Sequence, residues 1–309
     1  MQTTRRTFLA QAAALAVAGS VSAQQDKAPQ IMPFSFSLYG MRTVKLDAAL
    51  EACAKIGYDA VEFALRQGYH VEPSRFGKDE RRRLRDRLRN LRLSVPSLLH
   101  DLPLHGNAQT HRDNLQHLQA DFDLGQDLSP DAPPLLVTGL GGAVGDWDKL
   151  RRQFADRLGD WARLAEKHKT LITIKPHRSF AMNLPDHALW LMEQVKSPWI
   201  KVAYDYSHYQ HRDLSMADTL KTLLPHLRFV HIKDTRLING RPMFTLPGDG
   251  GVDYPQLLRA LRTAGYRGCI CVEVSAQVFN QKGYDPLAAA RRCYENVAPA
   301  FVKAEIRRR

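Results

Sequence analysis

The feature that most constrains the fold is a regular alternation of eight short apolar runs with eight longer amphipathic stretches. The apolar runs have the length of strands and lie at residues 34–38, 60–64, 94–99, 135–140, 171–176, 200–206, 228–233 and 269–274. The amphipathic stretches have helical spacing and lie at residues 46–56, 78–91, 111–124, 147–167, 185–195, 216–224, 254–264 and 286–303. This strict alternation is the order that closes a parallel (β/α)8 barrel. We therefore predict a single TIM barrel over residues 32–309; a doubly wound open sheet is the alternative and would normally have fewer strands.

The N-terminal residues have a pattern typical of exported proteins. Arg5 and Arg6 form a twin-arginine pair, an apolar Ala-rich run follows at residues 12–18, and a small-residue cleavage site ends at Ala23. The apolar run is shorter than the roughly 20 residues that span a bilayer, so we expect no stable membrane anchor. We predict a cleaved signal peptide at residues 1–23, a linker at 24–31, and a periplasmic mature protein. Because the twin-arginine route carries folded cargo, the barrel would acquire its fold, and any metal, before export.

The chain is basic, and the position of its charge bears on its partners. The formal net charge of +12 falls to +10 when Arg5 and Arg6 are removed with the signal peptide. Much of the remaining positive charge lies at residues 81–89 and 307–309. The first of these segments has helical spacing with leucines on one stripe, which indicates a solvated helix face over a buried seam. Since this charge lies away from the strand ends and export separates the chain from DNA, we expect no nucleic-acid partner.

The four cysteines do not form a disulfide framework. Cys269 and Cys271 are two residues apart on a predicted strand, so they face the same side and cannot easily bridge each other. Cys53 and Cys293 fall on predicted helices, and a disulfide between them is compatible with an oxidising compartment. Buried free thiols are nevertheless the expectation for all four.

Polar side chains end four predicted strands in the second half of the chain. They are, in chain order, Lys175 and His177, Asp205 and His208, His231 and Lys233, and Glu273. The carboxyl ends of parallel strands open into one mouth, where (β/α)8 enzymes place their active sites. Residues two apart on a strand face the same side, so His177 should face with Lys175, and Lys233 with His231. Glu62 and His100 end the second and third strands and are further candidates to line the pocket.

At these residues the chain resembles the xylose isomerase-like TIM barrels, the superfamily of sugar and sugar-phosphate isomerases and epimerases. The matching segments span nearly the whole predicted mature chain, at residues 56–62, 205–208, 229–234, 248–253 and 265–273. The resemblance implies a divalent metal held by Asp205, His231 and Glu273, together with a carboxylate on the fifth strand. Oxygen ligands with one imidazole suit Mn, Mg, Co or Zn. The resemblance also implies that glutamates on the fifth and eighth strands act as bases, but this chain has Lys175 in place of the first.

Lys175 leaves two interpretations open. Beside a metal it could be a neutral amine that acts as a base. Without a metal, its ammonium could pair with Asp205 and Glu273 and occupy the cation's place, in an enzyme or in a binding protein. A third alternative is a strand-end lysine that only reaches solvent.

The candidate site residues have the following expected roles. Lys175 and Glu273 are the catalytic candidates, and Asp205, His231 and Glu273 are the metal ligands. The substrate contacts are His177, which is also a candidate replacement ligand, His208, Lys233, Glu62 and His100.

The sequence thus predicts an exported isomerase or epimerase that abstracts a proton next to a carbonyl of a sugar or sugar derivative, assisted by a divalent metal. A lyase or hydratase acting on 3-keto-glycosides is the first alternative, because elimination needs only one base with an acid. A non-catalytic sugar-binding barrel is the alternative from another class, although the mouth has more polar residues than a binder needs. A nuclease resembling apurinic endonucleases would require further metal ligands. The expected partner is a small carbohydrate, and the sequence is compatible with a homo-oligomer.

Overall fold

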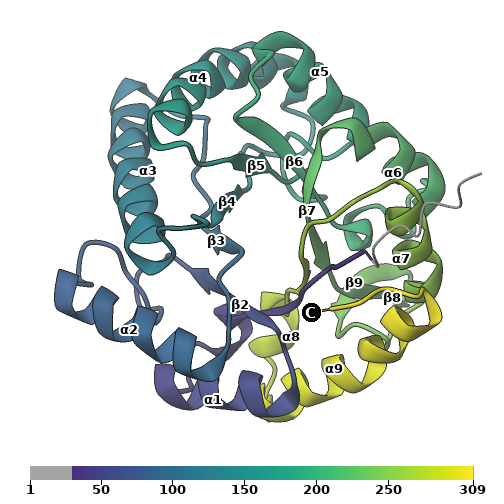
Figure 1. The fold of residues 1–309 in the computed structure, drawn as a ribbon. Helices are drawn as coiled ribbons and strands as arrows, with labels where there is room; N and C mark the ends of the chain where they lie inside the picture. Colours follow the sequence, from purple (N-terminus) through teal and green to yellow (C-terminus); the bar gives the residue numbers. More distant parts are fainter. Residues whose placement is uncertain (1–29, 309) are drawn as a thin grey trace, which may run out of the picture.

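The computed structural model describes residues 30–308 and shows a closed barrel of eight parallel strands inside a ring of helices (Figure 1). Each strand pairs with the next around the barrel, and β10 pairs with β1 to close it. The barrel strands are β1 (Phe34–Ser37), β2 (Ala60–Ala64), β3 (Ser97–Leu99), β4 (Leu135–Thr138), β5 (Ile172–Ile174), β6 (Ile200–Tyr204), β7 (Leu227–Ile232) and β10 (Ile270–Val272). The predicted (β/α)8 barrel is confirmed.

Eight longer helices cover the outside of the barrel (Figure 1). They are α1 (Leu46–Ile56), α2 (Lys78–Leu91), α3 (Ala108–Leu128), α4 (Trp147–His168), α5 (Pro185–Val195), α6 (Met216–Leu223), α7 (Tyr254–Thr263) and α9 (Pro286–Lys303). The larger apolar core lies between strands and helices and includes Trp161 of α4 and Phe301 of α9, each at most 1% exposed. Among the described residues, no helix is both long and apolar enough to cross a membrane.

A second, smaller core fills the interior of the barrel and determines which side chains reach its mouth. It contains Leu99, Val137, Ala203, Phe229, Cys269 and Cys271. Side chains alternate along a strand, so residues two positions further on face the same way. The interior residues Ala203, Phe229 and Cys271 are therefore followed by Asp205, His231 and Glu273. The apolar interior and the polar mouth follow from one period-two pattern.

The sequence did not predict an additional hairpin and a short helix at the carboxyl end of the barrel. Strands β8 (Asp234–Ile238) and β9 (Arg241–Thr245) pair antiparallel after β7, and α8 (Ala276–Phe279) follows β10. Several predicted strands were also too long at their carboxyl ends; the fifth, for example, ends at Ile174 and leaves Lys175 beyond it.

The predictions for the cysteines and for the N-terminal segment can also be compared with the structure. Cys53, Cys269, Cys271 and Cys293 are all free and buried, so Cys53 and Cys293 do not pair here. The predicted signal peptide and most of the predicted linker lie outside the described residues. At the end of that linker, Ile31 forms a parallel bridge with Arg307, next to the start of the barrel.

Candidate functional site

Two lysines and two carboxylates from four neighbouring strands form the centre of the mouth. Lys175 Nζ donates to both oxygens of Glu273, at 2.9 and 2.8 Å. Lys233 Nζ donates short hydrogen bonds to Asp205 and to Glu273. All four residues are at most 7% exposed. Lys175 is thus a buried ion-pair partner, and the alternative that it merely reaches solvent is wrong.

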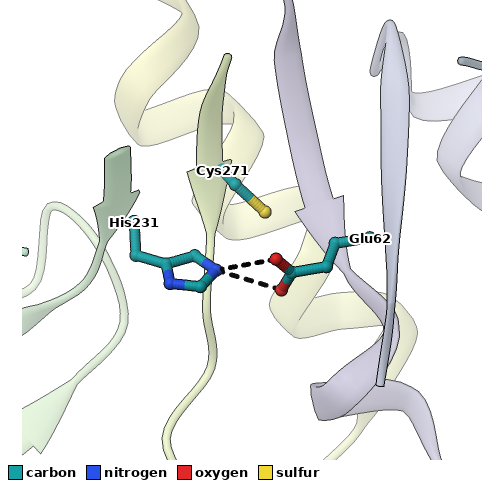
Figure 2. Close-up of side chains that lie close together, drawn as sticks. All are labelled: Glu62, His231 and Cys271. Carbon is teal, nitrogen blue, oxygen red and sulfur yellow. Dashed lines mark hydrogen bonds and ion pairs between the residues drawn. The ribbon is translucent and has the colours of Figure 1, made fainter. Parts of the chain in front are cut away.

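His231 joins this group to a buried glutamate below it. Its Nδ1 lies 3.1 Å from Lys175 Nζ, and its Nε2 lies 3.0 and 3.1 Å from the oxygens of Glu62 (Figure 2). An ammonium can only donate, so Nδ1 accepts and Nε2 carries the hydrogen that it donates to Glu62. Ser97 Oγ also donates to Glu62, at 2.7 Å. Glu62 therefore determines the tautomer of His231.

Charges at the centre are stabilised by their partners. Burial would raise the pKa of Glu273, but the charges of Lys175 and Lys233 hold it well below its usual range. Burial would lower the pKa of Lys233, but Asp205 and Glu273 raise it above its ordinary value. Glu273 is therefore a carboxylate and Lys233 an ammonium at neutral pH.

Two neutral histidines lie beside the charged group. The rings of His177 and His208 have centroids 4.1 Å apart, and His208 Nε2 is 3.4 Å from Lys233 Nζ. Burial, followed by the charges of Lys175 and Lys233, lowers the pKa of His177 to about 3. Burial and the neighbouring His177 and lysines place the pKa of His208 well below its usual value. Both rings are thus uncharged at physiological pH and can only offer neutral hydrogen bonds.

A cavity of about 220 Å³ opens above this group. Lys175, His177, Lys233 and Glu273 contribute to its wall. The remaining lining residues are Tyr39, Arg66, Asp101, Ser179, Phe180, Phe244, Ser275, Ala276 and Gln277. A second cavity, of about 660 Å³, adjoins it and shares Asp101, Ser179 and Phe180. The mouth therefore has a polar floor, aromatic sides and a neighbouring space, features that suit a carbohydrate.

The lining residues Arg66 and Asp101 were missed by the sequence analysis. They form an ion pair, and the Arg66 guanidinium lies 5.0 Å from the centre of the Tyr39 ring. Arg66 comes two residues after Ala64, and Asp101 two residues after Leu99. Extending the period-two pattern past the ends of β2 and β3 would have identified both.

Two predicted pocket residues have other partners. Glu62 is fully buried beneath the mouth and holds His231 instead of lining either cavity. His100 Nδ1 is 2.8 Å from Asp121 of α3, and His100 lines neither of the two cavities. His208, the third predicted substrate contact of this kind, is fully buried and also lines neither cavity. The geometry therefore gives no support for substrate contact by these three side chains.

The motif at residues 248–253 has a structural role. Asp234 accepts hydrogen bonds from the backbone N–H groups of Gly248 and Gly250, at 3.2 and 2.8 Å, and a short one from Tyr254. A Cβ on Gly250 would lie only 2.5 Å from Asp234 Cβ. The glycine lets the loop approach this carboxylate, so Asp234 anchors the loop after β9.

The predicted metal ligands meet at the mouth, but lysines already occupy their donor atoms. Lys175 contacts His231 and Glu273, and Lys233 contacts Asp205 and Glu273. A cation here would stand beside two ammonium groups and would lack the fourth carboxylate. The donor set does not fit a divalent metal in this arrangement.

A second group of potential ligands lies deeper in the barrel. The ligand atoms of Glu62, His231 and Cys271 lie within 4.8 Å of one another, close enough to surround a metal ion (Figure 2). Metal-binding cysteine must be a thiolate. Burial, with Glu62 nearby, raises the pKa of the Cys271 thiol well above its ordinary value. Glu62 and His231 are already hydrogen-bonded to each other, so a metal in this group would have to replace that hydrogen bond.

The sequence of the chain is similar to that of one family of barrel proteins. The family model described as "xylose isomerase-like TIM barrel" matches residues 50–294. L-ribulose-5-phosphate 3-epimerase UlaE of Escherichia coli O157:H7 (strain EC4115 / EHEC) is 23% identical over 159 residues, which cover 51% of this chain and 53% of that protein. The chain thus matches about half the length of this curated relative.

Solved structures show the same fold. The 3-keto-D-glucoside 4-epimerase YcjR from E. coli has a TM-score of 0.68 and 16% identity, and the match covers 87% of this chain and 99% of that one. The IOLI protein with a bound zinc atom has a TM-score of 0.71 and 17% identity, with the same two coverages. At such identities the likeness concerns the fold.

Proposed function

The chain belongs to the xylose isomerase-like TIM barrel family, and we propose that it is an enzyme that removes a proton next to a carbonyl of a sugar or sugar derivative. The observation that carries this proposal is the Glu273 carboxylate held between two lysine ammonium groups at the wall of a cavity. A base and a source of positive charge are what such a reaction requires. The names of its relatives, which include ribulose and keto-glucoside epimerases, support the same class.

Three residues of the centre, Glu273, Lys175 and Lys233, have a part in this chemistry. Glu273 takes the proton from carbon, and the electron pair moves to the carbonyl oxygen to form an enediolate. The ammonium groups of Lys175 and Lys233 stabilise that negative oxygen. When substrate oxygens accept the lysine hydrogens, Glu273 loses part of its stabilisation and becomes a stronger base. Return of the proton by Glu273 to the neighbouring carbon, while the enediolate hydroxyl proton passes to the former carbonyl oxygen, gives an isomer. Protonation of the original carbon on its opposite face, which requires an ammonium group such as that of Lys175 as the acid, gives an epimer.

A lyase acting on 3-keto-glycosides is the second candidate, favoured by two observations. The lysine-bound carboxylate Glu273 is one base, and the other carboxylate lining the first cavity, Asp101, is paired with Arg66. The adjoining cavity of about 660 Å³ offers room for a leaving group. In elimination Glu273 takes the proton, the carbon–oxygen bond on the next carbon breaks, and Lys175 donates a proton to the departing oxygen.

Proton NMR in D2O distinguishes these reactions. The purified protein would be incubated with ketoses and with 3-keto-glycosides. Isomerisation or epimerisation should place deuterium on the substrate carbon without loss of a group, whereas elimination should release the aglycone. Glu273→Gln keeps the shape of the side chain and should abolish both outcomes, while Asp131→Asn, at an exposed residue between α3 and β4, should change neither. If the wild-type protein binds these sugars but exchanges no proton, it is a binding barrel.

A further inference from the structure

We infer that the lysine pair of Lys175 and Lys233 replaces the divalent cation, so that the mouth supplies its own positive charge and binds no metal. The metal-binding part of this inference stands on geometry alone. Only the catalytic use of the two ammonium groups rests on the proposed function.

The lysine pair makes the connections that a bound cation would make. Lys175 Nζ bridges His231 Nδ1 at 3.1 Å and the two oxygens of Glu273 at 2.9 and 2.8 Å. Lys233 Nζ bridges Asp205 and Glu273. Each of the three expected ligands therefore has an ammonium group within hydrogen-bond distance of one of its potential donor atoms. Glu273 takes part in both bridges. It contacts the two ammonium groups in the way that a metal ligand contacts a central ion.

The charge balance leads to the same conclusion. Asp205 and Glu273 contribute two negative charges, and the lysine pair contributes two positive charges. A divalent ion added to this balanced group would lie within a few ångströms of two ammonium groups in a buried site, where like charges repel strongly. Lys175→Glu removes one positive charge and adds one negative charge. The net charge of the site would then be more negative than in the wild type by the amount that one divalent ion neutralises. The site would also regain the missing carboxylate.

Burial makes displacement of the lysines by a metal unfavourable. Lys175 and Lys233 are each 3% exposed. A metal that took Asp205 and Glu273 would leave both ammonium groups without these partners in a poorly solvated site. Buried charges without partners carry a large desolvation penalty. The lysine pair and a metal are therefore alternatives at this mouth.

Cobalt titration tests the inference without any substrate. The purified protein is dialysed against chelator and titrated with CoCl2, and the visible d–d bands of bound Co²⁺ are recorded. We expect no saturable band for the wild-type protein and no shift of its melting temperature with Co²⁺, Mn²⁺ or chelator. Lys175→Glu should bind Co²⁺ stoichiometrically, with affinity higher by about a hundredfold or more, as expected for changes in close charge pairs. Lys201→Glu, at the start of the strand that ends before Asp205, makes the same charge change away from the mouth and should bind no Co²⁺.

Several results would overturn the inference. Stoichiometric metal in the wild-type protein that is retained in Cys271→Ser would do so, because the deeper group would lack its thiol. Metal that is lost in Cys271→Ser belongs to the deeper group and leaves the claim for the mouth standing. A folded Lys175→Glu protein that binds no Co²⁺ would show that the lysine does not stand in for the ion. If Lys175→Glu does not fold, the wild-type and Cys271→Ser titrations still decide, because saturable Co²⁺ binding in both proteins refutes the claim. Catalytic failure with these metal results intact would count against the proposed reaction alone.

Discussion

Lys175 is the residue at which this chain departs from the pattern of its family, and its contacts make the departure testable. We predict that Lys175→Met lowers turnover by about 10²–10⁴, the range for loss of a general acid or base. The substitution should also lower the free energy of unfolding by about 1–3 kcal/mol, because Glu273 loses hydrogen bonds from a charged partner while keeping Lys233. Steady-state kinetics and urea unfolding measure the two effects.

The control for this substitution is Lys201→Met, which removes a lysine near the amino end of the neighbouring strand β6, away from the mouth, and should leave turnover unchanged. Wild-type turnover in Lys175→Met would show that Glu273 and Lys233 suffice for the reaction. It would also limit Lys175 to a structural ion pair.

The two neutral histidines at the mouth should make stability depend on pH. The pKa of His177 is lowered to about 3, against about 6.5 in an unfolded chain, and that of His208 is also lowered. Below about pH 6.5 the unfolded state binds protons that the folded state does not, so stability falls as the pH falls. Between pH 6 and 5, His177 alone should account for about 1 kcal/mol of this loss.

Urea unfolding of the wild type and of His177→Gln at both pH values isolates this contribution. The variant should show a smaller loss of stability between pH 6 and 5, by about the amount assigned to His177. Equal losses in the two proteins would mean that His177 is protonated in the folded state.

The sequence could predict the local features of the site but not the contacts between distant residues. Position on a strand is a local property, so the period-two pattern was enough to bring Asp205, His231 and Glu273 to one mouth. Partners across the barrel are not local. The bond from Glu62 to His231 joins residues 169 positions apart, and the bond from Lys175 to Glu273 joins residues 98 apart. The sequence alone therefore left open whether Lys175 was an ion-pair partner, a base or a solvated residue.

At the scale of elements, helices were easier to predict than strand ends. The bounds of α1, α2, α5 and α9 agree with the prediction, because apolar periodicity and Pro185 and Pro286 at the first turns mark them. Six of the eight barrel strands end earlier than predicted because pairing with neighbours stops before the polar mouth. The hairpin of β8 and β9 was missed although Asn239 and Gly240, both with positive φ, form the turn between its strands.

The loop after β9 offers a test of a glycine motif. In Gly250→Ala, the new Cβ would lie 2.5 Å from Asp234 Cβ and 2.8 Å from the Thr235 carbonyl oxygen. The loop must then move away from the carboxylate that anchors it, so we expect a loss of about 1–3 kcal/mol of stability. Gly251→Ala is the matched control, since the nearest atom to its Cβ is 3.9 Å away. Equal melting temperatures for the two variants would show that the Asp234 anchor contributes little.

At the scale of the whole molecule, barrel closure bears on the predicted route of export. β1 pairs with β10, so residues near 34 meet residues near 270. The closed barrel therefore forms only after nearly the whole chain has been made. A route for folded proteins suits such an architecture, and the twin-arginine pattern at Arg5 and Arg6 would select it.

We therefore predict that export depends on the arginine pair. Replacing Arg5 and Arg6 with lysine retains the charge but changes the feature that the twin-arginine route reads, so the protein should remain in the cytoplasm with its signal peptide uncleaved. Because β1 begins at Phe34, well beyond the predicted cleavage after Ala23, the trapped protein should keep the barrel and its activity in cell lysate. Fractionation of cells followed by mass spectrometry of the N-terminus measures both location and cleavage, and Lys27→Arg in the linker is the control. Normal periplasmic yield from the double variant would show that these arginines do not direct export.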